Sequence, residues 1–147
     1  MISKFLTVLR HHDGVERYLN GDCHHLAMAL HTIHRTGTLR ACLRETWMAE
    51  KDQWHADYSH MVYVDPLGET WDIDGSGAQY RWTRQWNGVN KDELGRPQQT
   101  LWMDIDHPIL EWLLAHGCLY RDVLVQRIVG QYKIWQKNPE TYLRRLT

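Results

Sequence analysis

A cysteine, a histidine and two aspartates in this sequence have the types and the order of a thiol-based catalytic site. Cys23 comes first along the chain, His60 follows, and Asp72 and Asp74 come after the histidine. A thiol becomes a strong nucleophile when a histidine takes its proton and the two form an ion pair. A carboxylate then holds the imidazole in the right tautomer and supports its positive charge. Cys23 is thus the candidate nucleophile, His60 the candidate base, and Asp72 or Asp74 the candidate orienting residue.

Cys23 is expected at the first turn of a helix that runs to about Arg35 and stops at Gly37. The thiol belongs to a buried stripe at helical spacing that continues with Leu26, Ala27, Leu30 and Ile33. Asp22 or Asn20 is the natural N-cap. The N–H groups and the dipole of a helix start favour a thiolate. The alternative is a small buried cysteine with a packing role only.

A hairpin is predicted to bring His60 to the aspartates. Residues 59–64 have strand character, Asp65-Pro66-Leu67-Gly68 suits a type I turn closed by a glycine bulge, and residues 69–74 return. If Asp65 pairs with Glu69, the same register puts His60 opposite Asp74. Asp72 is then the diagonal neighbour on the same face, so both aspartates are within side-chain reach of the imidazole.

Three short motifs within residues 15–77 resemble the papain-like cysteine peptidase superfamily, above all its small bacterial and phage members, alongside the NlpC-like and transglutaminase-like branches. The motifs are Gly21-Asp22-Cys23-x-x-Leu26-Ala27, then His60-x-Val62-x-Val64 with Asp65-x-x-Gly68, then Trp71-Asp72-Ile73-Asp74-Gly75. The resemblance implies an α+β fold in which an N-terminal helix carrying Cys23 packs on an antiparallel sheet carrying His60 and the aspartate. It favours Asp72 as the third residue, whereas the hairpin register favours Asp74.

The sequence departs from papain at the oxyanion hole. No glutamine stands at the expected place upstream of Cys23, where the chain holds Arg17, Tyr18 and Asn20. The backbone N–H of Cys23 can supply one donor to an oxyanion. The second donor is unassigned, which leaves an inactive or repurposed site as an alternative.

Candidate substrate-binding residues flank the catalytic candidates in the sequence. They are Asn20 and Asp22 before Cys23, and Trp82 and Trp86, interleaved with Arg81 and Arg84, after the hairpin. Glycines at positions 75 and 77 allow a reversal that brings the second group back along the rim of the cysteine site. Tryptophans provide stiff contact area and arginines clamp carboxylates, so we expect a groove wall that prefers acidic groups. The alternative places the tryptophans in the core and the arginines in solvent.

The other patterns predict a single domain over residues 1–147. A helix is expected over residues 2–12, a strand over 38–47, a polar loop over 48–57, and a C-terminal helical segment over about 106–147. The strand has one apolar face, made of Leu39, Ala41 and Leu43. Its other face is expected to meet water, and carries Arg40, Cys42 and Arg44.

Composition narrows the classes of partner. The chain of 147 residues is 43% hydrophobic and 24% charged, with a formal net charge of −1. These values are ordinary for a globular protein and argue against nucleic acid or an anionic membrane as partner. No apolar run reaches membrane-spanning length. Cys23, Cys42 and Cys118 form an odd set without C-x-x-C spacing, which indicates reduced thiols and a cytoplasmic protein.

Histidines crowd the predicted Cys23 helix, so a metal site is an alternative. They are His24, His25, His31 and His34. A His-Glu-x-x-His motif is absent and no second cysteine lies nearby, so we expect neither a metal nor a cofactor.

The sequence therefore predicts a cysteine-dependent hydrolase or acyltransferase that acts on an amide or ester bond through a Cys-His-Asp site. Its substrate is a peptide, a protein or a small amide. The competing hypothesis is a catalytically inactive binding protein of the same fold, possibly phage-encoded, that targets a host protein. The oligomeric state is left open.

Overall fold

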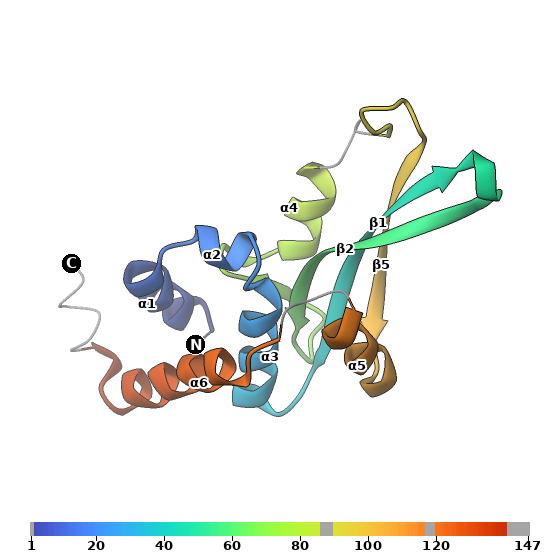
Figure 1. Cartoon of the computed structure of the whole chain (residues 1–147). Coiled ribbons are helices and arrows are strands. Elements are labelled where there is room, and N and C mark those ends of the chain that lie inside the picture. Colours follow the sequence, from blue (N-terminus) through green and yellow to red (C-terminus); the bar gives the residue numbers. More distant parts are fainter. Residues whose placement is uncertain (1, 86–89, 117–119, 141–147) are drawn as a thin grey trace.

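The structure, a computed structural model, describes residues 2–85, 90–116 and 120–140. It has an α+β fold in which helices pack against one antiparallel sheet (Figure 1). The elements in chain order are α1 (Ile2–Asp13), α2 (Glu16–Leu19), α3 (Cys23–His34), β1 (Thr38–Met48), η1 (Ala49–Lys51), β2 (Gln53–Val64), β3 (Thr70–Asp72), β4 (Gly75–Ser76), α4 (Ala78–Gln85), β5 (Gln98–Ile105), α5 (His107–His116) and α6 (Asp122–Lys137).

The sheet has the strand order β4-β3-β2-β1-β5, and each neighbouring pair is antiparallel. The predicted strand over residues 38–47 is confirmed as β1. The predicted loop over 48–57 is wrong, because β1 and β2 continue as a long hairpin closed by η1 (Figure 1). Residues 53–57 are exposed, so backbone hydrogen bonds rather than burial hold this ribbon. Trp54, Ala56 and Tyr58 alternate with polar residues, which is the strand signal that the predicted loop overlooked.

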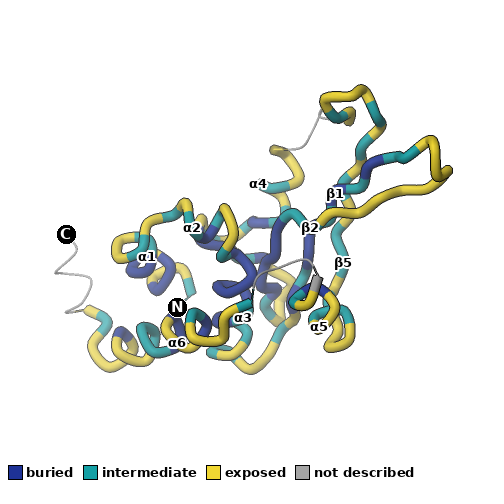
Figure 2. The backbone as a smooth tube through the Cα atoms, in the orientation of Figure 1, coloured by how far each residue is buried: buried dark blue, intermediate teal, exposed yellow. Residues whose placement is uncertain are grey.

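The main hydrophobic core lies between the helices and one face of the sheet. Phe5 and Leu9 of α1, Leu30 of α3 and Ile128 of α6 meet there, together with Tyr63 of β2. Figure 2 shows this buried region around α1 and α3, while the hairpin tip is exposed. The core fixes α3 against β2 and α6, so the start of α3 has a defined place beside the sheet.

The other face of the sheet is covered by α4, which the sequence did not predict as a helix. Val62 and Val64 of β2 pack against Ala78 of α4. Cys42 and Arg44 are buried rather than exposed to water, so the predicted wet face of β1 is wrong at these positions. The buried Arg44 guanidinium donates from Nη1 to Thr100 Oγ1 at 2.8 Å and from Nη2 to Gln98 Oε1 at 3.2 Å, both on β5.

The connection from α3 to β1 differs from the predicted helix end. Arg35, not Gly37, takes the left-handed conformation directly after α3, with φ of 57°. Gly37 has φ of 83°, and a Cβ at this position would lie 2.2 Å from the carbonyl oxygen of Val64. Glycine is therefore required there by close approach to β2 rather than as the helix cap.

The hairpin turn after β2 forms as predicted. The N–H of Asp65 donates to the Glu69 carbonyl at 2.9 Å, and the N–H of Gly68 donates to the Asp65 carbonyl at 2.9 Å. β2 and β3 then pair in the predicted register, with Val64 opposite Thr70. Helices α5 and α6 lie within the predicted C-terminal helical segment, and no described helix is long and apolar enough to span a membrane.

Candidate functional site

The loop before α3 places Cys23 at the first position of the helix. Gly21 has φ of 124°, a conformation that side chains disfavour, and Asp22 occupies the N-cap position. The Asp22 carboxylate does not cap the helix; it accepts from His25 Nδ1 at 2.8 Å and from Arg17 Nε at 3.1 Å. The first N–H groups of α3 are thus not occupied by that carboxylate, and their dipoles act on the sulfur.

Cys23 is only 4% exposed, yet its thiol is acidic. Its Sγ lies 3.0 Å from the hydroxyl oxygen of Tyr58 on β2. Burial by itself raises the pKa of Cys23, but hydrogen bonds with His24 and His60, the charge of His60 and the hydrogen bond with Tyr58 lower that pKa to about 6. At neutral pH Cys23 is therefore a thiolate, and Tyr58 must be the hydrogen-bond donor.

His60 is completely buried beside this thiol. Its Nε2 lies 3.1 Å from Asp72 Oδ2, and its Nδ1 makes no hydrogen bond of ordinary length and angle. Burial lowers the pKa of His60, but the hydrogen bonds and negative charges of Asp72 and Cys23 outweigh burial and raise that pKa to about 9. Because Nε2 faces Asp72, Nδ1 is the nitrogen that remains for the sulfur.

Together these shifts describe an ion pair. With the pKa of Cys23 near 6 and that of His60 near 9, the sulfur is negative and the imidazole positive at pH 7. This is the charge state that a nucleophilic cysteine requires.

Asp72 is held in place from three directions. Besides His60, its Oδ1 accepts from the backbone N–H of Asp74 at 2.9 Å and from Arg81 Nη2 at 2.8 Å. Burial raises the pKa of Asp72, but the hydrogen bond and charge of His60, the Asp74 N–H and the charge of Arg81 lower it overall. The carboxylate is thus ionised and accepts the Nε2–H of His60.

Asp74 does not lie opposite His60. β3 ends at Asp72, the chain turns at residues 73–74, and β4 pairs back on β3, with Asp72 opposite Gly75. Asp74 is exposed at that turn. The register of the hairpin was predicted correctly, but the strand ends two residues before it can bring Asp74 to the histidine.

The predicted substrate-binding tryptophans have different outcomes. Trp82 on α4 stacks on the His60 ring, with a centroid distance of 4.1 Å and an interplanar angle of 16°, and its Nε1 donates to Ser59 Oγ at 3.4 Å. It covers the imidazole and holds its plane. Trp86 lies outside the described residues. Arg81 cannot clamp an acidic substrate, because its guanidinium already binds Asp72 and the carbonyls of Gly75 and Ser76.

Asn20 and Asp22 line a separate cavity of about 380 Å³ together with Arg17, His25 and Arg121; Cys23 is not among its lining residues. His25 Nε2 accepts the backbone N–H of Arg121 at 2.9 Å, so its Nδ1 carries the proton donated to Asp22. Burial lowers the pKa of His25, which suits this neutral tautomer. Within the described parts of the chain, no three histidine, cysteine, aspartate or glutamate side chains are arranged to hold a metal ion.

The sequence reasoning missed Tyr58 and His24 as neighbours of the thiol. Tyr58 lies just before a bulge, where Ser59 has no β1 partner while Tyr58 pairs with Leu43 and His60 with Cys42. The bulge puts Tyr58 on the α3 face with Met61, and nothing in the sequence marks it. Comparison of the chain with protein-family models, with curated proteins and with solved structures finds no match.

Proposed function

We propose that this protein is a cysteine-dependent hydrolase or acyltransferase that acts on an ester or amide bond. Cys23 is the nucleophile, His60 the base and then the acid, and Asp72 the orienting residue. The observation that carries this proposal is the buried His60, whose Nε2 faces Asp72 and whose Nδ1 is left for an acidic thiol at a helix start. A buried ion pair at such a place is costly without a function.

The reaction follows from the charge state. The Cys23 thiolate attacks the acyl carbonyl carbon, and a C–S bond forms. The bond to the leaving alcohol or amine breaks, and the leaving group takes the proton from His60. Water or another acceptor then gives a proton to His60 and attacks the thioester carbonyl carbon. The C–S bond breaks, which releases the carboxylic acid or the new ester or amide and regenerates the Cys23 thiolate.

Two groups are our candidates for stabilising the oxyanion. The backbone N–H of Cys23 is one donor, as expected from the sequence. The Tyr58 hydroxyl, 3.0 Å from the sulfur, is our candidate for the second donor, which the sequence left unassigned. A thioester sulfur accepts hydrogen bonds poorly, so acylation releases this hydroxyl to donate to the developing oxygen anion.

The papain-like arrangement is part of the same proposal. It is supported by an α-helix that starts at the cysteine, an antiparallel sheet that carries the histidine, and an aspartate at Nε2 of the imidazole. Both described cysteines, Cys23 and Cys42, are free thiols, which suits a reducing compartment such as the cytoplasm.

The test is to trap the acyl-enzyme. The protein is mixed with p-nitrophenyl acetate and followed by stopped-flow absorbance and intact mass. We expect a burst of p-nitrophenol and an acetyl group on the Cys23 peptide, both lost in Cys23→Ala and kept in Cys42→Ala. If Cys23 is never acylated and the ester is not cleaved, the inactive binding protein is the better interpretation.

A further inference from the structure

We propose that an apolar cavity between the sheet and α5 binds the apolar acyl chain of the substrate, so that the preferred substrates are esters or amides of medium-length aliphatic or aromatic acids. This inference rests on the proposed function and names the substrate class of that site. It replaces the acidic preference expected from the sequence, because Arg81 is bound internally and no described basic residue lines this cavity.

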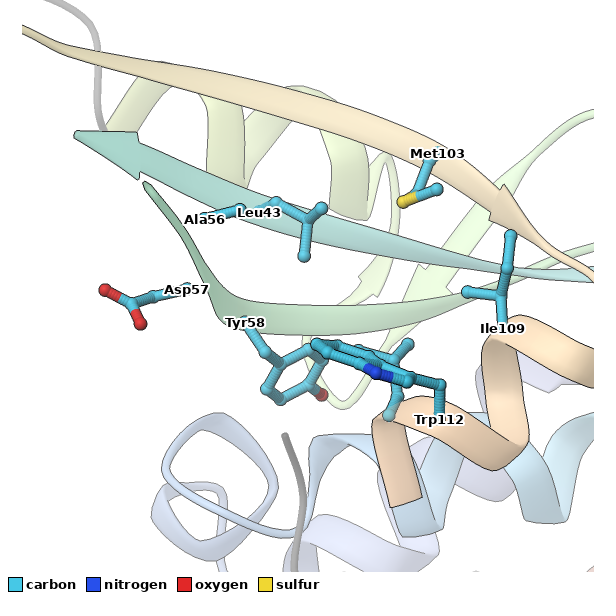
Figure 3. A pocket seen from close by; sticks show the side chains of 8 residues that line it. Leu43, Ala56, Asp57, Tyr58, Met103, Ile109 and Trp112 are labelled. Atoms are coloured by element: carbon cyan, nitrogen blue, oxygen red, sulfur yellow. The ribbon is translucent and has the colours of Figure 1, made fainter. Parts of the chain in front are cut away.

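The cavity has the size of a small-molecule site. Its volume is about 490 Å³, within the ~300–1,000 Å³ range of ligand pockets. Figure 3 shows its walls, with β1, β2 and β5 on one side and α5 on the other. The lining residues are Leu43, Ala56, Asp57, Tyr58, Met103, Ile109, Trp112 and Leu113.

The lining is suited to an uncharged chain. Asp57 is the single charged residue among those that line it, and its carboxylate points away from the cavity in Figure 3. Trp112 is 59% exposed at this site, a large apolar surface that a ligand can cover. Leu113 also belongs to the small core formed with Ala41 and Met61, so the cavity continues that core to the surface.

One tyrosine connects the cavity to the thiol. Tyr58 lines the cavity, while its hydroxyl lies 3.0 Å from Cys23 Sγ. A carbonyl carbon attacked by that sulfur therefore lies beside Tyr58, and the chain attached to the carbonyl has this cavity as the adjacent apolar space. The hydroxyl that we assign to the oxyanion thus belongs to a residue of the cavity wall.

The experiment measures alkylation of Cys23 by N-alkylmaleimides with methyl, ethyl, propyl and butyl groups. In this reaction the thiolate adds to the C=C bond and the neighbouring carbon takes up a proton, so no turnover is needed. Rates are divided by those for glutathione, and Cys23 is quantified by peptide mapping in a Cys118→Ser background. Each methylene is expected to raise the relative rate about fourfold, or about 60-fold from methyl to butyl.

Two matched variants assign the effect to the cavity. Ile109→Trp fills the cavity, so its relative alkylation rate should no longer depend on alkyl length. Glu111→Trp changes an exposed position on the same helix and should keep the wild-type dependence on alkyl length. If the wild-type series is flat, or Cys23 is not alkylated, the inference is overturned. If the alkylation rate of Ile109→Trp rises with alkyl length as steeply as that of the wild type, the alkyl group binds elsewhere and the inference is also wrong.

An ester series separates this inference from the proposed function. p-Nitrophenyl acetate, butyrate and hexanoate should show kcat/KM rising with length in wild type and not in Ile109→Trp. Cleavage of all three esters at equal kcat/KM, dependent on Cys23, would overturn the chain-binding cavity and leave the acyl-transfer function intact. A steep maleimide series without any turnover would support the cavity and reject the function.

Discussion

Cys23 and Cys42 are both buried thiols, 4% and 0% exposed, but they have opposite acidities. Cys23 has a pKa lowered to about 6, whereas burial raises the pKa of Cys42 to about 12 against the opposing effects of the Arg44 charge and a hydrogen bond with Trp82. Cys42 is even the direct β1 partner of His60 in the sheet register. Being close to the histidine backbone therefore does not make a thiol reactive.

The two pKa values differ because hydrogen-bond donors are directed at the sulfur of Cys23. Around Cys23 a helix start, Tyr58, His24 and His60 all favour the negative sulfur. Cys42 lies in the middle of a strand, opposite His60 of β2 on one side and Trp102 of β5 on the other, and no described helix start points at its sulfur. Burial raises the pKa of any thiol; only donors aimed at the sulfur reverse that effect.

The largest expected effect is the difference in alkylation between the two thiols. At pH 7 the thiolate fraction of Cys23 exceeds that of Cys42 about 10⁵-fold, and the lower nucleophilicity of the more acidic thiolate reduces this to about 10²-fold or more. Iodoacetamide labelling of the Cys118→Ser protein, followed by peptide mapping, measures the ratio. Comparable rates for both thiols would remove the basis of the comparison.

Replacing His60 should make the reactivity of the Cys23 thiol more like that of the Cys42 thiol. In His60→Gln the thiol loses its cationic partner, so its pKa rises, and alkylation at pH 6 should fall about 20-fold once the higher nucleophilicity of the remaining thiolate is included. His34→Gln, at the far end of α3, is the matched control and should leave the rate unchanged. An unchanged rate in His60→Gln would mean that no ion pair exists.

The pH profile tests the signs of the two shifts. The Cys23 pKa is lowered, so the thiolate is lost as the pH falls through about 6. Below pH 6, kcat/KM should drop about tenfold per pH unit. The His60 pKa is raised, so its proton is lost as the pH rises through about 9, and kcat/KM should fall there. A plateau between the two values is expected. A single limb near pH 8.5, typical of a free thiol, would contradict it.

The smallest effect distinguishes the two aspartates. Asp72→Asn removes the negative charge at Nε2 and lowers the pKa of His60. The upper limb of the pH profile should move down by about one unit, with about fivefold lower kcat/KM at pH 9. Asp74→Asn, exposed at the turn, should change neither value. Thermal melts of both variants serve as the folding control, and a larger loss in Asp74→Asn would reverse the assignment.

The sequence by itself determined the local features near the site. Helical spacing after Cys23 identified α3, Asp65-Pro66-Leu67-Gly68 determined the turn, and the turn set the β2–β3 register. The types and order of Cys23, His60 and the aspartate pair were enough to propose a thiol site. These features depend on neighbours within a few residues, for which side-chain periodicity and turn chemistry are sufficient.

Tertiary structure decided which side chains meet. Asp72 rather than Asp74 contacts His60 because the chain reverses after β3, and Tyr58 reaches the sulfur because of a bulge in β2. α4 covers the face of β1 that its polar residues suggested was wet, and it places Trp82 over His60. Strand length, bulges and the helix that packs on a face result from contacts between distant segments. The pKa values of Cys23 and His60 depend on those same contacts, and so they were not readable from spacing.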